Sequence, residues 1–185
     1  MRNLIYAINL TLDGCCDHTK LSANDEMFEY YARLTRDVDL LVYGRKTYEL
    51  MVPFWPEIAK TNSGQTEAMN DFAQAFAAKP IVVFSRSLER AESENTRIVR
   101  TSLQDEILKL KQADGSGILM GGVDVPSQLI ELGLVDEYRV VVQPLVVGEG
   151  RRLFDDLSLP EKLQLKLVDS KFLESGYVAL HYLKQ

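Results

Sequence analysis

The chain has 185 residues, a formal net charge of −6 and 46% hydrophobic residues. Its length fits one domain, residues 1–185, and its composition supplies a full core without disulfides or a metal. An acidic chain lacks the basic face that general nucleic-acid binding needs, and no apolar run is long enough to span a membrane. We therefore expect neither nucleic acid nor a membrane as a partner.

The N-terminus and the cysteines indicate the cellular compartment in which the protein is expected. Residues 1–3 run directly into a strand-like stretch and lack the features of a signal peptide. The only cysteines, Cys15 and Cys16, are adjacent, which is poor geometry for a structural disulfide. This cysteine usage is typical of a reducing compartment, so we expect a cytoplasmic protein.

The first predicted elements are a strand and a helix. The apolar stretch from Asn3 to Leu10 predicts a central strand, and residues 11–14 end it in an Asp-Gly turn. Residues 22–26 offer a helix cap with acids in the first turn. Apolar residues then recur at three- and four-residue spacing up to Leu34, which predicts a helix with one buried face.

A short apolar run, residues 40–43, predicts a second buried strand, and a basic turn follows it. After Gly44 come Arg45, Lys46 and Thr47, at the predicted start of a helix. Unpaired backbone N–H groups and the helix dipole favour an anion at such a position, so this turn is a candidate phosphate site. An ordinary strand-to-helix turn that happens to be basic is the alternative.

An aromatic pair, Phe54 and Trp55, lies between Pro53 and Pro56. The prolines predict a stiff loop, on which Trp55 either forms a wall for a planar ligand or caps the core. A helix from Glu67 to Ala77 follows.

A third strand, residues 80–84, ends in Ser85 and Arg86, so it repeats the strand-then-basic-turn pattern. The planar fork of arginine suits phosphate. Residues 97–99 predict a short edge strand, and residues 102–112 predict a helix that begins at Ser102.

A fourth apolar strand ends in Met120-Gly121-Gly122-Val123 and passes into a helix whose first turn holds Pro126. Paired glycines allow backbone to approach a ligand closely, and a helix start behind them favours an anion. On its own, the dipeptide Gly121-Gly122 does not identify a phosphate-binding turn.

The last third predicts a strand that follows Val135, a glycine loop and a hairpin. Glu149, between Gly148 and Gly150, faces a substrate or, as the stronger alternative, pairs with Arg151 or Arg152. Residues 163–172 and 176–183 alternate as an antiparallel hairpin does. The two histidines, His18 and His181, are isolated and predict no metal site.

Four motifs, in order, resemble the dihydrofolate reductase-like superfamily. They are Thr11-Leu12-Asp13-Gly14, Gly44-Arg45-Lys46-Thr47-Tyr48-Glu49, the strand followed by Gly121-Gly122, and Gly148-Glu149-Gly150-Arg151-Arg152-Leu153-Phe154. The last motif, preceded by Leu134-Val135-Asp136-Glu137-Tyr138, is similar to the reductase domain of bacterial riboflavin-biosynthesis deaminase/reductases and their stand-alone relatives. The resemblance covers nearly the whole chain.

The resemblance implies a three-layer α/β/α fold, with a mostly parallel central sheet and a C-terminal antiparallel hairpin. Alternation of strands and helices followed by a hairpin indicates the same α/β class independently. The resemblance also implies a homodimer and an NADPH-dependent reductase that transfers hydride to a small heterocyclic or carbonyl substrate, similar to a riboflavin precursor or a pterin. A missing deaminase domain argues against the two-step riboflavin enzyme, and a missing clear pterin-protonating acid argues against a genuine dihydrofolate reductase. The alternative is a non-catalytic nucleotide-binding or dimerisation module on the same fold.

Site residues carried over by the resemblance form three groups. The cofactor would be held by Asn9, Thr11, Gly44, Arg45, Lys46, Thr47, Ser85, Arg86, Met120, Gly121, Gly122 and Val123. Ser85-Arg86 and the Gly44-Arg45 turn would hold the adenosine 2′-phosphate, which favours NADPH over NADH. Phe54 and Trp55 would lie toward the substrate, and Asp13 and Glu149 are the candidate catalytic residues.

Overall fold

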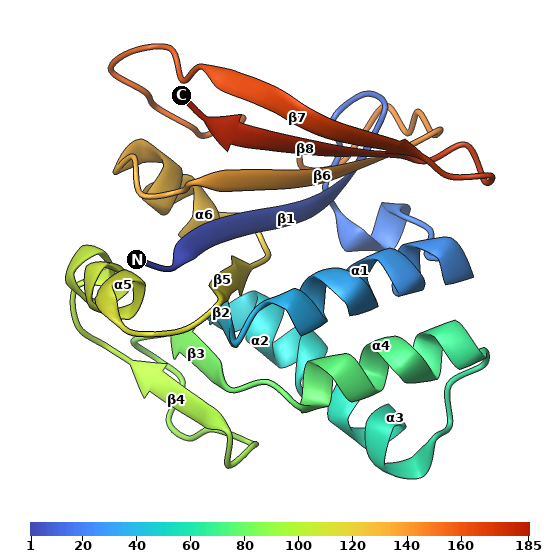
Figure 1. Ribbon diagram of the computed structural model, residues 1–185, viewed down its shortest axis with the longest axis horizontal. Coiled ribbons are helices and arrows are strands. Elements are labelled where there is room, and N and C mark those ends of the chain that lie inside the picture. The colour runs from blue at the N-terminus through green and yellow to red at the C-terminus, as the bar shows by residue number, and fades with distance from the viewer.

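An eight-stranded sheet runs through the computed structural model, which describes residues 1–185, and helices cover both faces (Figure 1). The strands are β1 (Asn3–Thr11), β2 (Leu40–Gly44), β3 (Ile81–Phe84), β4 (Thr96–Val99), β5 (Gly117–Met120), β6 (Glu137–Gln143), β7 (Leu165–Phe172) and β8 (Val178–Lys184). The helices are the 3₁₀ helix η1 (His18–Lys20), α1 (Asp25–Asp37), α2 (Arg45–Met51), α3 (Trp55–Thr61), α4 (Glu67–Ala77), α5 (Leu103–Gln112) and α6 (Asp124–Glu131).

The strand order is β4-β3-β2-β5-β1-β6-β8-β7. All neighbouring pairs from β4 to β6 are parallel, and β8 is antiparallel to both β6 and β7. In Figure 1 the hairpin of β7 and β8 forms the upper edge of the sheet and β4 the lower edge. The expected α/β fold with a mostly parallel sheet and an antiparallel C-terminal hairpin is confirmed.

Parallel pairing brings several strand ends to one edge of the sheet. Gly44 at the end of β2 is in register with Phe84 at the end of β3. Met120, the last residue of β5, is in register with Val42 and with Tyr6. The turns after β2, β3 and β5 therefore share the carboxyl edge, where ligands bind in open parallel sheets.

Alternate strand residues face opposite sides of the sheet and build two cores. One core, against α1, α2 and α4, includes Ile5, Ala7, Leu41, Tyr43, Val83, Leu119, Ala32, Leu34, Tyr48, Phe72 and Phe76. The other, against α5 and α6, includes Leu4, Tyr6, Val42, Val82, Ile118, Met120, Ile107, Leu129 and Ile130. Burial of each large apolar side chain contributes about 1.5–3 kcal/mol, so these cores fix the strand ends that form the site.

Local signals place most helix ends. Asn24 caps α1, where its Oδ1 accepts a hydrogen bond from the Met27 N–H at 3.0 Å. Ser102 caps α5, where its Oγ accepts from the Asp105 N–H at 3.3 Å. The predicted helix from Glu67 to Ala77 is confirmed as α4.

The expected stiff loop around Phe54 and Trp55 is wrong, because Trp55 begins the short helix α3. Pro56 lies in its first turn, where no backbone N–H is needed for the helix and the fixed φ of proline is helical. The proline therefore starts a helix here instead of preventing one.

None of the helices combines the length and the apolar composition that a membrane crossing requires.

Candidate active site

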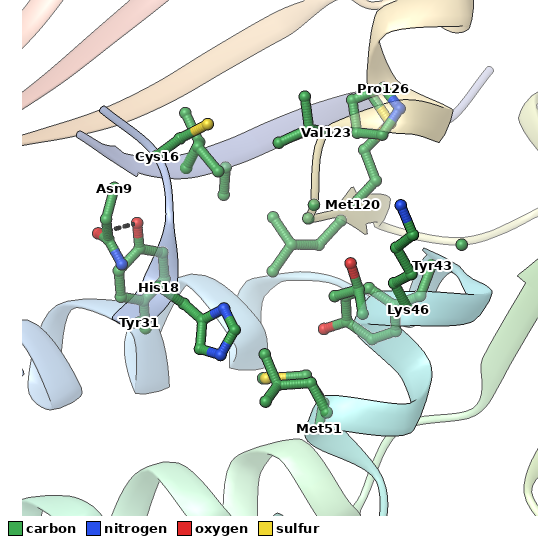
Figure 2. A pocket seen from close by; sticks show the side chains of 18 of the residues that line it. Asn9, Cys16, His18, Tyr31, Tyr43, Lys46, Met51, Met120, Val123 and Pro126 are labelled. Atoms are coloured by element: carbon green, nitrogen blue, oxygen red, sulfur yellow. Dashed lines mark hydrogen bonds between the residues drawn. The ribbon is translucent and has the colours of Figure 1, made fainter. Parts of the chain in front are cut away.

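A cavity of about 1060 Å³ opens at the carboxyl edge of the sheet, between β1, β2 and β5 and the helices α1 to α4 (Figure 2). Its lining combines a polar end, built from the turns after β2 and β5, with an apolar wall from α1, α3 and α4. This size and mixture are typical of small-molecule sites.

The polar end begins where β2 passes into α2. Gly44, Arg45, Lys46 and Thr47 all line the cavity. Arg45 lies 3.7 Å from Glu49 on the same helix, as an exposed ion pair that contributes little to stability. Both basic side chains are exposed and therefore available to an anion.

The glycine turn after β5 lies directly against this basic turn. Gly122 has φ +88°, and a Cβ added to it would lie 2.3 Å from the Thr47 Oγ1 atom. A Cβ at Gly44 would lie 3.1 Å from Val125. Side chains at these glycines would close the space between the two turns, so bare backbone keeps it open.

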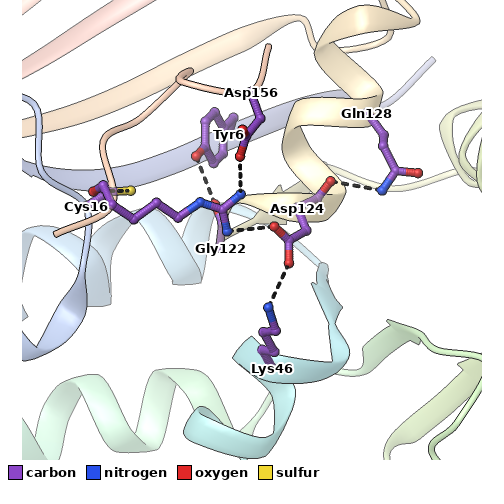
Figure 3. A network of polar contacts seen from close by, with 8 residues as sticks. Tyr6, Cys16, Lys46, Gly122, Asp124, Gln128 and Asp156 are labelled. Atoms are coloured by element: carbon purple, nitrogen blue, oxygen red, sulfur yellow. Dashed lines mark hydrogen bonds and ion pairs between the residues drawn. The ribbon is translucent and has the colours of Figure 1, made fainter.

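A charged network spans the mouth of this end (Figure 3). The Arg151 guanidinium donates to the Asp124 carboxylate at 2.7 Å, and Lys46 Nζ lies 3.4 Å from the same carboxylate. The hydrogen bond from Arg151 holds the pKa of Asp124 below its usual range. Arg151 is held beside the cavity because its carbonyl accepts from the Cys16 N–H at 2.8 Å.

The opposite wall is aromatic and aliphatic. Trp55 packs edge-on against Phe72 and Phe28, with ring centroids 4.7 Å and 5.7 Å away. All three rings line the cavity. Trp55 thus belongs to the packing around the core and to the cavity wall at once.

A small group of polar side chains lies at the end of the cavity away from Lys46 (Figure 2). Tyr31 donates its hydroxyl hydrogen to Asn9 Oδ1 at 2.8 Å, which leaves the Asn9 Nδ2 hydrogens for a ligand. Cys16 and His18 complete this group, and burial raises the pKa of the Cys16 thiol.

Comparison with known sequences decides the family. The sequence model of the RibD C-terminal domain matches residues 2–179. This chain belongs to the RibD C-terminal domain family. It is 30% identical over 186 aligned residues to the Bacillus subtilis (strain 168) protein called "Uncharacterized protein YyaP", covering 98% of this chain and 94% of that protein.

Solved structures show the same fold at low identity. The diaminohydroxyphosphoribosylaminopyrimidine deaminase/5-amino-6-(5-phosphoribosylamino)uracil reductase of Thermotoga maritima matches all of this RibD C-terminal domain with a TM-score of 0.68 and 16% identity. The chain spans 57% of that longer protein. Dihydrofolate reductase from Enterococcus faecalis, complexed with NADP(H), matches with a TM-score of 0.64 and 14% identity, covering 99% of this chain and 96% of the reductase.

Most residues predicted for the site in this RibD C-terminal domain are brought together. Asn9, Gly44, Arg45, Lys46, Thr47, Phe54, Trp55, Met120, Gly121, Gly122 and Val123 all line the cavity. They come from four separate regions of the chain, and the parallel pairing of β1, β2 and β5 makes neighbours of those that lie on these strands and the turns after them.

Thr11 and Asp13 do not line the cavity, because they stabilise the turn after β1. The Thr11 hydroxyl donates to Asp13 Oδ1 at 2.6 Å and accepts from the Cys15 N–H at 2.9 Å. Asp13 also accepts from the backbone N–H groups of Gly148 and Val147. These bonds, that from Thr11 foremost, lower the pKa of Asp13 to about 2, so it is a carboxylate at neutral pH and not a proton donor.

Glu149, Ser85 and Arg86 also lie outside the lining. Glu149 is exposed and pairs with Lys20, so the expected pairing with Arg151 or Arg152 is wrong. Ser85 Oγ accepts from the Leu88 N–H at 2.9 Å and so closes the turn after β3. Arg86 is exposed next to Phe84, whose side chain does line the cavity.

Sequence reasoning missed several lining residues of the domain. Cys16, His18, Tyr31, Asp124 and Arg151 are examples. Arg151 is part of the recognised Gly148–Phe154 motif, but its position depends on pairing between residues 15 and 152, which no local pattern indicates. Tyr31 follows the apolar spacing that predicts the buried face of α1, and that face also forms a cavity wall.

Proposed function

We propose that this RibD C-terminal domain is an NADPH-dependent reductase of a small molecule. One observation carries the proposal: a single cavity joins a basic end, made of the turns after β2 and β5 and suited to an anion, to an aromatic end that suits a planar substrate. The shared fold of a dihydrofolate reductase complexed with NADP(H) agrees with this reading.

The residues present fit a dinucleotide. Close approach of its diphosphate needs backbone without side chains, and the turns at Gly44 and Gly121-Gly122 supply it. Lys46 and Arg151 would hold the diphosphate, and Arg45 with Arg86 would hold the 2′-phosphate, because the ends of β2 and β3 are neighbours. A phosphate would replace Asp124 as the partner of Lys46 and Arg151.

The chain's contribution to the reaction is placement and a dry environment. When bound, the reduced nicotinamide supplies a hydride to an electrophilic substrate carbon, and the neighbouring atom of the reduced double bond takes up a proton. Asn9 would orient either ring through its Nδ2 hydrogens, since its Oδ1 is engaged by Tyr31. The wall around Trp55 excludes water. His18 also lines the cavity, where its ring nitrogens can form hydrogen bonds with a ligand.

The proposal is tested by titrating the purified protein with NADPH and NADH. Binding is followed by calorimetry and by fluorescence of Trp55, the only tryptophan. We expect NADPH to bind at least about tenfold more tightly than NADH, and Arg45→Ala with Arg86→Ala to remove that difference, because both guanidinium groups are exposed for a phosphate.

Arg33→Ala is the matched control, since Arg33 is exposed on α1 away from the cavity. It should leave the preference for NADPH intact. Binding of neither nucleotide would refute the proposal. Tight binding without cofactor oxidation by any substrate would favour a non-catalytic nucleotide-binding module.

We further propose that the domain is a homodimer that associates through β7. This strand is the edge of the sheet, and seven of its eight residues are exposed. Leu167 is 50% exposed and Phe172 is 79% exposed. An edge strand with large exposed apolar side chains is normally covered, and a second copy would cover it.

A further inference from the structure

Formal charge is confined to one end of the cavity. Among the lining residues, Arg45, Lys46 and Glu49 belong to α2, Asp124 begins α6, and Arg151 lies on the loop beside it. In the proposed function these groups serve the cofactor. Any charged group on the substrate would have to find its partner elsewhere in the lining.

The wall supplied by α1, α3 and α4 carries no acid, lysine or arginine. Its side chains include Met27, Phe28, Trp55, Met69, Phe72 and Phe76. The carboxylates of α1 point elsewhere: Glu26 accepts from the N–H groups of Glu174 and Ser175, and Asp25 accepts from the Thr66 hydroxyl. The wall therefore offers no ion pair to a substrate.

Apart from His18, whose side chain is 65% exposed, the titratable groups that face this part of the cavity are held neutral. Burial raises the pKa of Tyr31 well above its ordinary value, and burial also raises the pKa of Tyr43. Burial raises the pKa of the Cys16 thiol as well. What remains for recognition is hydrogen bonding, by the Asn9 amide, the hydroxyl of the buried Thr35 and the imidazole of His18.

We infer that the substrate is an uncharged aromatic or conjugated carbonyl compound, without phosphate or carboxylate. Burial of an anion against this wall would leave its charge unpaired, at a cost that exceeds what the surrounding contacts return. A neutral ring gains edge-to-face contact with Trp55 and Phe72 and a hydrogen bond from Asn9 to its carbonyl oxygen. This class differs from the phosphoribosyl compound in the name of the Thermotoga maritima reductase.

The inference rests on the proposed function, which assigns the basic end to the cofactor, and its test separates the two. The protein, saturated with NADP⁺, is titrated by calorimetry with menadione, an uncharged naphthoquinone, and with 5-amino-6-(5-phosphoribosylamino)uracil and dihydrofolate. We expect menadione to bind at least about tenfold more tightly than either charged compound. Trp55→Ala should weaken menadione binding about tenfold, whereas Leu108→Ala, an exposed apolar position on α5, should not change it.

Equal or tighter binding of either charged compound would overturn the inference. Failure of menadione to bind a protein that still binds NADP⁺ would overturn it too. If NADP⁺ itself does not bind, the proposed function fails; menadione binding that depends on Trp55 would then still support an uncharged ligand. An unchanged menadione affinity in a folded Trp55→Ala variant would also overturn the inference, because the compound would then bind away from the wall.

Discussion

Gly122 is the single position where backbone conformation and space at the site both demand glycine. Its φ is +88°, and an added Cβ would lie 2.3 Å from the Thr47 Oγ1 atom. We expect Gly122→Ala to lower the free energy of unfolding by about 1–3 kcal/mol, because strain and a steric contact add. It should also weaken NADPH binding, since the turn must move away from α2. Urea unfolding and calorimetry measure the two effects.

The matched control is Gly148→Ala, which separates the effect of backbone strain from the effect of a steric contact such as that with Thr47. Gly148 has φ +70° but nothing within 4 Å of an added Cβ. This variant should lose only about 1 kcal/mol, the cost of a left-handed backbone for a non-glycine residue, and should bind NADPH normally. Equal effects of the two substitutions would mean that the space beside Thr47 has no special role.

At the residue scale, the sequence identified turns better than side-chain roles. Gly44, Gly121 and Gly122 could be found because a glycine at a strand end has a local conformational reason. The roles of Asp13 and Glu149 could not be judged, because their partners, the Gly148 backbone and Lys20, are more than a hundred positions away in the chain. Asp13, predicted to be catalytic, instead accepts a hydrogen bond from the Gly148 backbone N–H. Glu149, also predicted to be catalytic, instead pairs with Lys20 at the surface.

Elements were predictable where a local signal decides them. The ends of α4 and the start of α5 follow from their caps and their apolar spacing. The helix α3 was missed because a proline both interrupts and begins helices, and only the surrounding packing decides between these roles.

The pairing of β6 with β8 places the titratable side chain of His181 beside the buried Glu137, which should make stability depend on pH. Glu137 accepts from His181 Nε2 at 2.9 Å and from Asn3 Nδ2 at 2.7 Å. Burial, with the charge of Arg139, nevertheless lowers the pKa of His181 below its ordinary value of 6.5. The unfolded chain therefore takes up this proton at a higher pH than the folded protein does.

Because the pKa of His181 is lower in the folded protein than in the unfolded chain, its contribution to stability is complete above its ordinary pKa and is lost as the pH falls below that value. We expect urea unfolding to show lower stability at about pH 5.5 than at about pH 7.5, and His181→Gln to reduce the difference. Gln retains a hydrogen-bond donor toward Glu137. His18→Gln is the control, because the His18 side chain is 65% exposed. An undiminished pH dependence in His181→Gln would assign the effect to other groups.

At the scale of the whole molecule, the class of fold could be predicted but the strand order could not. Alternating strands and helices indicate parallel pairing, and the final hairpin indicates an antiparallel end. The placement of β5 between β2 and β1 depends on contacts between strands far apart in the chain. That placement forms the site, since it sets the Gly121-Gly122 turn beside the start of α2.

The exposed β7 edge leads to a prediction about assembly. If a second copy covers this strand, sedimentation velocity should give the mass of a dimer for the wild-type protein. Leu167→Glu combined with Phe172→Glu should give a monomer, because both side chains are exposed in the single chain and glutamates there would be buried unpaired in a dimer. Leu108→Glu, at an exposed apolar position on α5, should remain dimeric.

Unfolding curves show whether the double variant retains its fold. A wild-type monomer, or a folded double variant that still dimerises, would place any association elsewhere and leave β7 as a bare edge protected by the charges of Lys166, Asp169 and Lys171.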